Sequence, residues 1–267
     1  MSGLVERIKD ILVPVVAVVA FFVLWDRSID WFSVPRHLLP RPGDVLTALW
    51  NGYVGGRYWI HFFTTLKQMW YGYLIGCSVA LILAAMVAEF RMVERVVQPF
   101  VVAFQSMPKV ALAPLLIVWF GFGMTSKVVL VALICFFPVF INAVTGFKSA
   151  SADHLRLYRA FNASRLSIFW NVKLPSAAET IFAGLQIAVV LALIGSVVGE
   201  FITARHGLGF LIQASTLSFD VATMFAAIIS LSVIGVVSTT VIRLIQARVV
   251  HWAERNAAAG TATAAAP

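Results

Sequence analysis

The chain has 267 residues, of which 61% are hydrophobic and only 12% are charged, and its mean hydropathy is +0.92. A soluble domain carries roughly a quarter of charged residues, and one core in water has no room for this much apolar surface. These values exclude a soluble globular enzyme, a disordered chain and a fibrous repeat. They indicate a chain embedded in a membrane.

The net charge of +8 would suggest nucleic-acid binding in a soluble protein. In a membrane protein, Lys and Arg instead accumulate in cytoplasmic loops, and the basic residues here are scattered rather than gathered in one stripe. We therefore expect no nucleic-acid partner. Cys77 and Cys135 both lie in apolar stretches, which argues against a disulfide framework and a cysteine metal site.

Six apolar stretches are candidates to cross a bilayer, each as a helix, because an open strand leaves backbone groups unpaired in lipid. They lie at residues 11–25, 62–88, 96–120, 128–147, 177–202 and 221–245. The first is short, and Pro108 breaks the third. We predict an all-α membrane protein with six transmembrane helices in one domain, residues 1–250. Residues 257–267, rich in Ala, Gly and Thr, predict a disordered tail.

The loops between the predicted spans give an orientation. With the N-terminus inside, the inner loops carry about twice as many Lys and Arg residues as the outer loops, which predicts that both termini are cytoplasmic. The longest external loop, 26–61, contains a short amphipathic stretch, 43–50, with Asp44 in its first turn. The longest internal loop, 148–175, carries five basic residues and one acid.

Apolar residues recur in the internal loop near helical spacing. We predict a helix over 152–160 that ends at Asn162, which tolerates a left-handed conformation. Ser164 then caps a second short helix, and Pro175 opens the next span. Two short helices on the cytoplasmic face suit either an amphipathic element resting on anionic lipid or a docking element for a cytoplasmic partner.

This loop resembles the cytoplasmic coupling loop of bacterial ATP-binding-cassette (ABC) importer permeases. The consensus of that family is Glu-Ala-Ala, three residues, Gly, nine residues and Ile-x-Leu-Pro. Asn162 takes the Gly position and Val172 the Ile position, and Leu174 and Pro175 match. Positions 156–158 are Arg-Leu-Tyr instead of Glu-Ala-Ala, so any ion pair that the family's Glu makes is absent or inverted.

Other segments extend the resemblance over about residues 20–250. Residues 37–42 are similar to the Leu-Pro-x-Pro motif ahead of the family's first external helix. Residues 107–116 and 119–121 resemble the third-span signature of the taurine, nitrate and sulfonate branch. Residues 199–201 and 207–209 resemble the region that follows the fifth span.

The resemblance implies a type I ABC importer permease of MetI-like architecture in the bacterial inner membrane. It implies a homodimer, two cytoplasmic ATPase subunits and an external binding protein that delivers a small polar or anionic organic solute. The sequence contains no Gly-x-x-x-x-Gly-Lys-Ser/Thr phosphate loop. We therefore expect ATP and Mg²⁺ on the partner ATPase, and no cofactor, metal or catalytic residue on this chain. The implied ATPase-coupling residues are Leu155, Arg156, Tyr158, Arg159, Ala160, Asn162, Ala163, Ser164, Leu174 and Pro175.

Polar groups inside predicted spans are costly and are candidates for the translocation path. They are Gln105, Ser106, Lys109, Asn142 and Glu200, together with Pro108, which frees a backbone carbonyl inside the third span. Lys109 either favours an anionic or carbonyl-bearing solute or marks a helix junction. Asn142 either lines the path or bonds across helices. Glu200, with Arg205 close behind, forms a gate, a contact for the binding protein or a solvated interfacial pair.

Two other functions are alternatives to an importer. An ion-coupled secondary transporter would show an internal repeat and buried acids in its spans, and the sequence gives no sign of either. An intramembrane enzyme would need a nucleophile and a base facing each other at depth. The predicted spans contain serines but no histidine.

Overall fold

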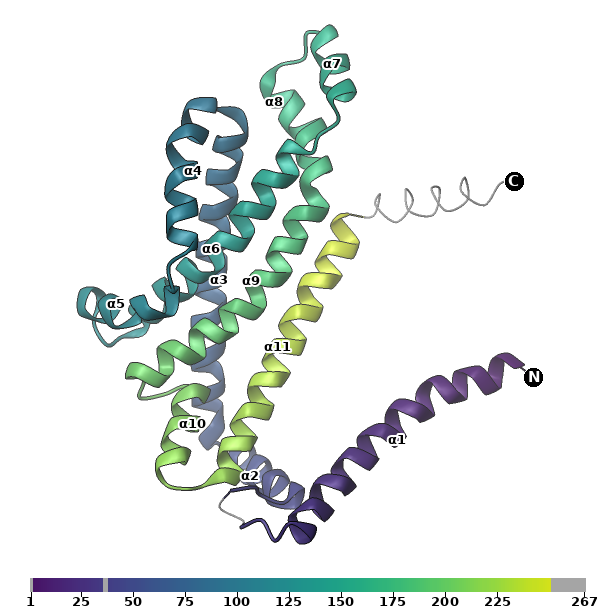
Figure 1. The fold of residues 1–267 in the computed structure, drawn as a ribbon, viewed down its shortest axis with the longest axis vertical. Coiled ribbons are helices and arrows are strands. Elements are labelled where there is room, and N and C mark those ends of the chain that lie inside the picture. Colours follow the sequence, from purple (N-terminus) through teal and green to yellow (C-terminus); the bar gives the residue numbers. More distant parts are fainter. Residues whose placement is uncertain (1, 36–37, 251–267) are drawn as a thin grey trace.

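The computed structural model describes residues 2–35 and 38–250, and over these ranges the chain forms helices and turns without strands. The predicted tail, 257–267, and His37 of the external motif lie outside the described residues. Long helices run side by side as a bundle, and α1 extends away from it (Figure 1). The α-helices are α1 (Ser2–Trp31), α2 (Pro42–Val54), α3 (Arg57–Glu89), α4 (Arg91–Gln105), α5 (Ala113–Phe120), α6 (Met124–Lys148), α7 (Ala152–Ala160), α8 (Arg165–Ile168), α9 (Leu174–Thr203), α10 (Leu208–Leu217) and α11 (Val221–Val249).

The described helices account for five of the six predicted spans. Four helical segments are long and apolar enough to cross a bilayer, namely α3, α6, α8 continued into α9, and α11, and α4 with α5 qualifies as a bent pair. The predicted first span lies inside α1, which is not in this set. Its apolar part of about 15 residues measures about 22 Å as a helix, less than the roughly 30 Å of hydrocarbon in a bilayer. The predicted first span, and with it the total of six spans, therefore stays a prediction.

The third predicted span is broken at Pro108, as its sequence predicts, but the break is a sharp bend. α4 and the segment Lys109–Phe120 meet at 90°. Proline has no backbone N–H and disfavours the helical conformation at the residue before it. The chain therefore turns at Pro108 and restarts with a 3₁₀ turn, Lys109–Leu112, before α5.

Three spans form the centre of the bundle: α3 and α9 both pack along α6. Their backbones approach closely at glycines. A Cβ on Gly76 of α3 would lie 2.8 Å from the Cα of Ala132 in α6, and one on Gly184 of α9 would lie 2.9 Å from the Cβ of Asn142. Such contacts leave little room for these three helices to slide past one another.

The bundle has two different ends (Figure 1). α7 and α8 lie at one end, called here the α7 end; α2, α10 and the last turns of α1 lie at the other, the α10 end. The amphipathic stretch predicted over 43–50 is confirmed as part of α2, with Asp44 in its first turn. Tyr53 of α2 donates a hydrogen bond to Ser230 of α11 at 2.7 Å. Arg41 forms an ion pair of 2.6 Å with Asp30, which ties the end of α1 to α2.

Candidate functional site

Residues 149–173 leave the bundle as an arm that joins α6 to α9. The arm consists of α7, α8 and a π-helical turn, Phe169–Lys173. None of the residues of α7 is buried, and the helix projects beyond the ends of its neighbours (Figure 1). The two helices at its root, α6 and α9, share the most extensive contact in the described bundle. The arm is therefore exposed at its tip and firmly held at its base.

The predicted local structure of the arm is confirmed at three residues. Asn162 has a φ of +52°, in the left-handed region, directly after α7. Ser164 begins α8, and its hydroxyl accepts a hydrogen bond from the Ser167 N–H at 3.2 Å. Pro175 lies in the first turn of α9, as predicted.

The π-helical turn was not predicted. It joins α8 to α9 without a break, so that Arg165–Ile202 is one continuous apolar helical segment. Turns of this kind are rare and often lie at functional sites. No sequence pattern marks such a turn, because it differs from an α-helix only in which carbonyl each N–H selects.

The residues predicted to contact an ATPase come together on this arm. They divide into exposed residues (Arg156, Arg159, Ala160, Asn162 and Ser164) and partly buried residues (Leu155, Tyr158, Ala163, Leu174 and Pro175). Arg156 lies 3.8 Å from Asp153, but their side chains are 80% and 89% exposed. Such a pair in water contributes little stability, so Arg156 remains available to a partner.

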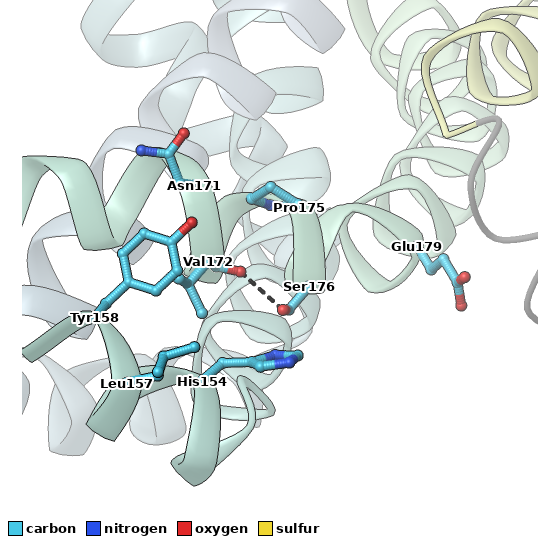
Figure 2. A pocket seen from close by; sticks show the side chains of 8 residues that line it. All are labelled: His154, Leu157, Tyr158, Asn171, Val172, Pro175, Ser176 and Glu179. Atoms are coloured by element: carbon cyan, nitrogen blue, oxygen red, sulfur yellow. Dashed lines mark hydrogen bonds between the residues drawn. The ribbon is translucent and has the colours of Figure 1, made fainter. Parts of the chain in front are cut away.

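An open cavity of about 590 Å³ separates α7 from the start of α9. Tyr158, Leu157 and His154 line it from α7, and Val172, Pro175 and Ser176 line it from the opposite side (Figure 2). Ser176 donates a hydrogen bond to the Val172 carbonyl at 2.7 Å, which closes the turn at the base of the cavity. The cavity leaves α7 supported mainly through its two ends.

Two ion pairs fix the root of the arm to the turn between α3 and α4. Lys173 pairs with Glu89 at 2.6 Å, with side chains only 16% and 22% exposed, and also donates to the Ala88 carbonyl at 3.2 Å. Lys148 pairs with Glu94 at 2.5 Å. No local sequence pattern marks these pairs, because the partners are 54 and 84 positions apart in the chain.

The polar residues predicted near Pro108 lie at the 90° bend. Gln105 and Ser106 are exposed, and the Ser106 hydroxyl donates to the Val102 carbonyl at 3.2 Å. The Lys109 ammonium donates to the Gln105 carbonyl at 3.1 Å and lies 4.7 Å from the centre of the Phe137 ring. Lys109 therefore closes the helix junction, which was one of its two sequence interpretations.

Asn142 bonds within its own helix rather than across helices. Its amide donates to the Pro138 carbonyl at 2.8 Å, and its Cβ faces Gly184 of α9. Asn142 thus lies at the closest approach of α6 and α9. In this conformation its side chain serves the packing of these two helices.

Glu200 lies at the α10 end and is fully enclosed, with 0% exposure. One carboxylate oxygen accepts a hydrogen bond from the Thr65 hydroxyl of α3, and the other accepts from the Gly209 N–H of α10, both at 2.7 Å. The same Thr65 hydroxyl accepts from the Leu208 N–H at 2.8 Å. We call Thr65, Glu200 and residues 207–209 the α10 clasp. A solute cannot reach Glu200 in this conformation, and no Arg205 pair with it is present among the described residues.

Two buried polar residues near this clasp carry no clear signal in the sequence. Lys127 directly precedes the predicted span 128–147, but it is only 4% exposed, and its ammonium donates to the Phe122 and Gly123 carbonyls at 3.2 Å. Thr65 was not singled out. The pair of glycines at 207 and 209, shortly after an acid in an apolar run, was the available signal of a close backbone approach.

No group of three or more His, Cys, Asp or Glu side chains suited to a metal ion occurs within residues 2–35 and 38–250. Several polar contacts join different helices, among them Thr65–Glu200 and Lys173–Glu89.

Comparison with known proteins identifies the family. Residues 72–251 match the family described as "Binding-protein-dependent transport system inner membrane component". The chain is 33% identical over 237 residues to the riboflavin transport system permease protein RibX of Chloroflexus aurantiacus, covering 89% of this chain and 88% of that protein. It is 30% identical over 251 residues to the formylaminopyrimidine transport permease protein ThiX of Halalkalibacterium halodurans, covering 94% of this chain and 100% of that protein. It is 28% identical over 219 residues to the taurine transport system permease protein TauC of Escherichia coli, covering 80% of each.

A solved structure supports the fold. An inward-facing conformation of the MetNI methionine ABC transporter matches with a TM-score of 0.60 at 19% identity, covering 71% of this chain and 92% of that chain. The predicted MetI-like fold and the resemblance to the taurine and sulfonate branch are thus confirmed. The relatives are transport permeases rather than enzymes. This chain accordingly belongs to the inner-membrane permease family of binding-protein-dependent ABC importers.

Proposed function

We propose that the arm of this permease, residues 149–173, binds a separate ATPase subunit and passes its movement to the membrane spans. The observation that carries this proposal is the placement of α7, a helix without buried residues held at both ends by α6 and α9. A nine-residue helix is too short to be stable alone in water. At its tip, Phe161 is 79% exposed, and exposed aromatic side chains are frequent anchors in protein interfaces.

The root of the arm supports a mechanical role. The Lys173–Glu89 and Lys148–Glu94 pairs hold the arm to the α3–α4 turn, and α6 packs closely against α3 and α9. A displacement of α7 by closing ATPase subunits would therefore move these spans together. That movement would alternate the access of the path between the two sides of the membrane.

The remaining partners follow from the same arrangement. ATP and Mg²⁺ would bind to the ATPase, since the sequence has no phosphate loop of its own. Two permease copies would each present one arm to one of two ATPase subunits. With the arm in the cytoplasm, the α10 end would face an external solute-binding protein, and both termini would be cytoplasmic in a bacterial inner membrane.

We propose that the translocation path runs beside the bend at Pro108. Irregular backbone within an apolar membrane segment is tolerated only beside protein or water, not against lipid. Gln105 and Ser106 are exposed on the surface of the single chain. We therefore place this bend at the interface with the second copy, beside the translocation path, with Lys109 nearby to attract an anionic or carbonyl-bearing group.

The names of the relatives suggest a substrate class. They cite riboflavin, formylaminopyrimidine, aliphatic sulfonates and taurine. These are small polar or anionic organic solutes, and we propose the same class for this permease.

Reconstitution with the cognate ATPase tests the arm. Ala160→Glu places a charge on the exposed face of α7, and we expect it to abolish co-purification of the ATPase and ATP-driven uptake. Gly43→Glu, on α2 at the α10 end where a Cβ meets no atom within 4 Å, is the matched control and should keep the complex. An intact, active complex with Ala160→Glu would refute the docking proposal.

Uptake into vesicles reconstituted with the permease tests the alternative of an ion-coupled secondary transporter. An ATP-driven importer takes up no solute without ATP, whatever the ion gradient. Uptake by the permease alone, driven by a proton or sodium gradient, would overturn the proposal in favour of the alternative.

A further inference from the structure

Two cavities lie side by side at the α7 end, between the α3–α4 turn and the root of the arm. The larger has a volume of about 750 Å³ and the smaller about 360 Å³. Glu89, Phe90 and Arg165 line both of them. The two cavities therefore adjoin each other, and together they are called here the turn site.

The larger cavity of the turn site is basic. Arg91, Arg159, Arg165 and Lys173 line it against a single acid, Glu89. Lys173 already neutralises Glu89 through their 2.6 Å ion pair. Arg91 and Arg165 form no ion pair with any carboxylate in the described part of the chain. The cavity therefore has an excess of positive charge that suits a phosphate group.

The smaller cavity is apolar. Ala85 and Met86 line it from the last turns of α3, and Phe90, Leu166 and Phe169 line it from the turn and the arm. Ala85 and Met86 belong to a helix that is long and apolar enough to span the bilayer. With 33 residues, α3 is longer than the hydrocarbon layer, and Ala85 and Met86 lie in its last two turns. We therefore place this half of the site close to the membrane surface, within reach of an acyl chain.

We propose that the turn site binds an anionic phospholipid, with its phosphate between Arg91 and Arg165 and an acyl chain along Leu166, Phe169 and Met86. A basic pocket next to an apolar groove at a membrane surface has the shape and charge of such a lipid. An acidic segment of a partner protein would match the basic half only. The bound lipid joins α3 and α4 to α8, next to the Glu89–Lys173 pair, and so stabilises the root of the arm.

Lipid binding to the purified full-length chain in detergent tests this site. We would titrate palmitoyl-oleoyl phosphatidylglycerol and, separately, phosphatidylcholine with the same acyl chains, and count the lipids retained by native mass spectrometry. We expect at least tenfold tighter retention of one phosphatidylglycerol. Arg91→Gln/Arg165→Gln should remove that preference. Arg95→Gln/Arg248→Gln is the control with the same charge change at exposed sites, and it should retain the preference.

Two further measurements separate the halves of the site. Leu166 is 67% exposed, so Leu166→Gln should keep the fold. This substitution should weaken phosphatidylglycerol retention severalfold without creating a preference for phosphatidylcholine. Glycerol phosphate at millimolar concentration should not displace the lipid from the unaltered chain.

Specific outcomes would overturn the inference. They are equal retention of the two lipids by the unaltered chain, equal loss of preference in both double variants, or displacement by glycerol phosphate, which would indicate a site for a free anion. The result does not depend on the proposed function. A permease whose arm bound no ATPase would still show or lack this lipid preference.

Discussion

Glu200 is a carboxylate inside an apolar bundle, and its hydrogen bonds join three helices. It lies on α9, takes a hydrogen bond from Thr65 on α3, and takes another from the Gly209 N–H on α10. α10 has only ten residues, which is too short to span a bilayer. α10 also packs against α11 and α9, and these polar contacts fix its first turn.

The Thr65 hydroxyl is the link between α3 and the clasp, so its removal should be costly. Thr65→Val keeps the shape but leaves the Glu200 oxygen and the Leu208 N–H without their partner at 2.7 and 2.8 Å. We expect the free energy of unfolding in detergent to fall by about 2 kcal/mol. Thr64→Val is the control, since the Thr64 hydroxyl bonds only to its own helix, at the Ile60 carbonyl, and should cost much less. Equal losses would contradict this account of the clasp.

Gly207 combines a left-handed backbone with close contact to the clasp. Its φ is +130°, and a Cβ at this position would collide with the Glu200 carboxylate. Gly207→Ala should therefore lower the free energy of unfolding by about 2 kcal/mol or more, from backbone strain and displacement of the carboxylate. Thermal unfolding of the purified chain would measure it. Gly123→Ala, where φ is −75° and no atom lies within 4 Å, should be nearly neutral.

Among the elements, the arm shows how the backbone conformation of one residue, Asn162, ends α7 and sets the direction of α8. α7 ends because Asn162 adopts φ +52°, and the Asn162 and Ala163 N–H groups donate to the Arg159 and Tyr158 carbonyls, both at 3.0 Å. A β-branched residue is strained in this conformation, whereas glycine adopts it freely. The direction in which α8 leaves α7 therefore depends on the residue at 162.

Two substitutions at position 162 should have opposite effects on the arm. Asn162→Val should lower the free energy of local opening of the arm by about 1–2 kcal/mol. Because about 1.4 kcal/mol equals a factor of ten in local opening, amide hydrogen exchange over 152–160 should become roughly tenfold faster. Asn162→Gly should leave that exchange nearly unchanged. The amides of α6 serve as an internal reference. Faster exchange in the glycine variant than in the valine variant would show that the left-handed turn does not control the arm.

At the scale of the whole molecule, α1 and the α4–α5 bend both expose surfaces in the single chain, and these surfaces differ in polarity. α1 extends away from the bundle (Figure 1), and its apolar side chains are exposed around it, with Phe21 at 61% and Leu24 at 57%. On the other side of the bundle, the α4–α5 bend exposes Gln105 and Ser106. The apolar helix is compatible with lipid, but the polar bend requires protein or water.

Cross-linking in native membranes tests whether two copies meet at the bend. Ser106→Cys should yield a dimer-sized species with a short bifunctional maleimide. The native Cys77 and Cys135 are only 5% and 0% exposed, so they should not react. Trp50→Cys, exposed on α2 at the α10 end, is the control and should stay monomeric. Absence of cross-links from Ser106→Cys would place the dimer interface elsewhere.

The sequence by itself determined the features that depend on local chemistry and apolar length. Residues within a few positions of one another determine these features. They are most spans, the proline break, the α7 boundaries, the Asn162 turn and the Ser164 cap. The coupling motif also identified the family, because its residues are contiguous in the chain.

Only the tertiary structure decided how the polar residues are used. Thr65 and Glu200 are 135 positions apart, and Lys173 and Glu89 are 84 apart, so their pairing depends on how the spans pack. The 90° size of the bend and the turn site likewise require the packed bundle. The physical reason is the same in each case: in an apolar bundle, a polar group takes whichever partner packing brings within reach, and no local pattern encodes that choice.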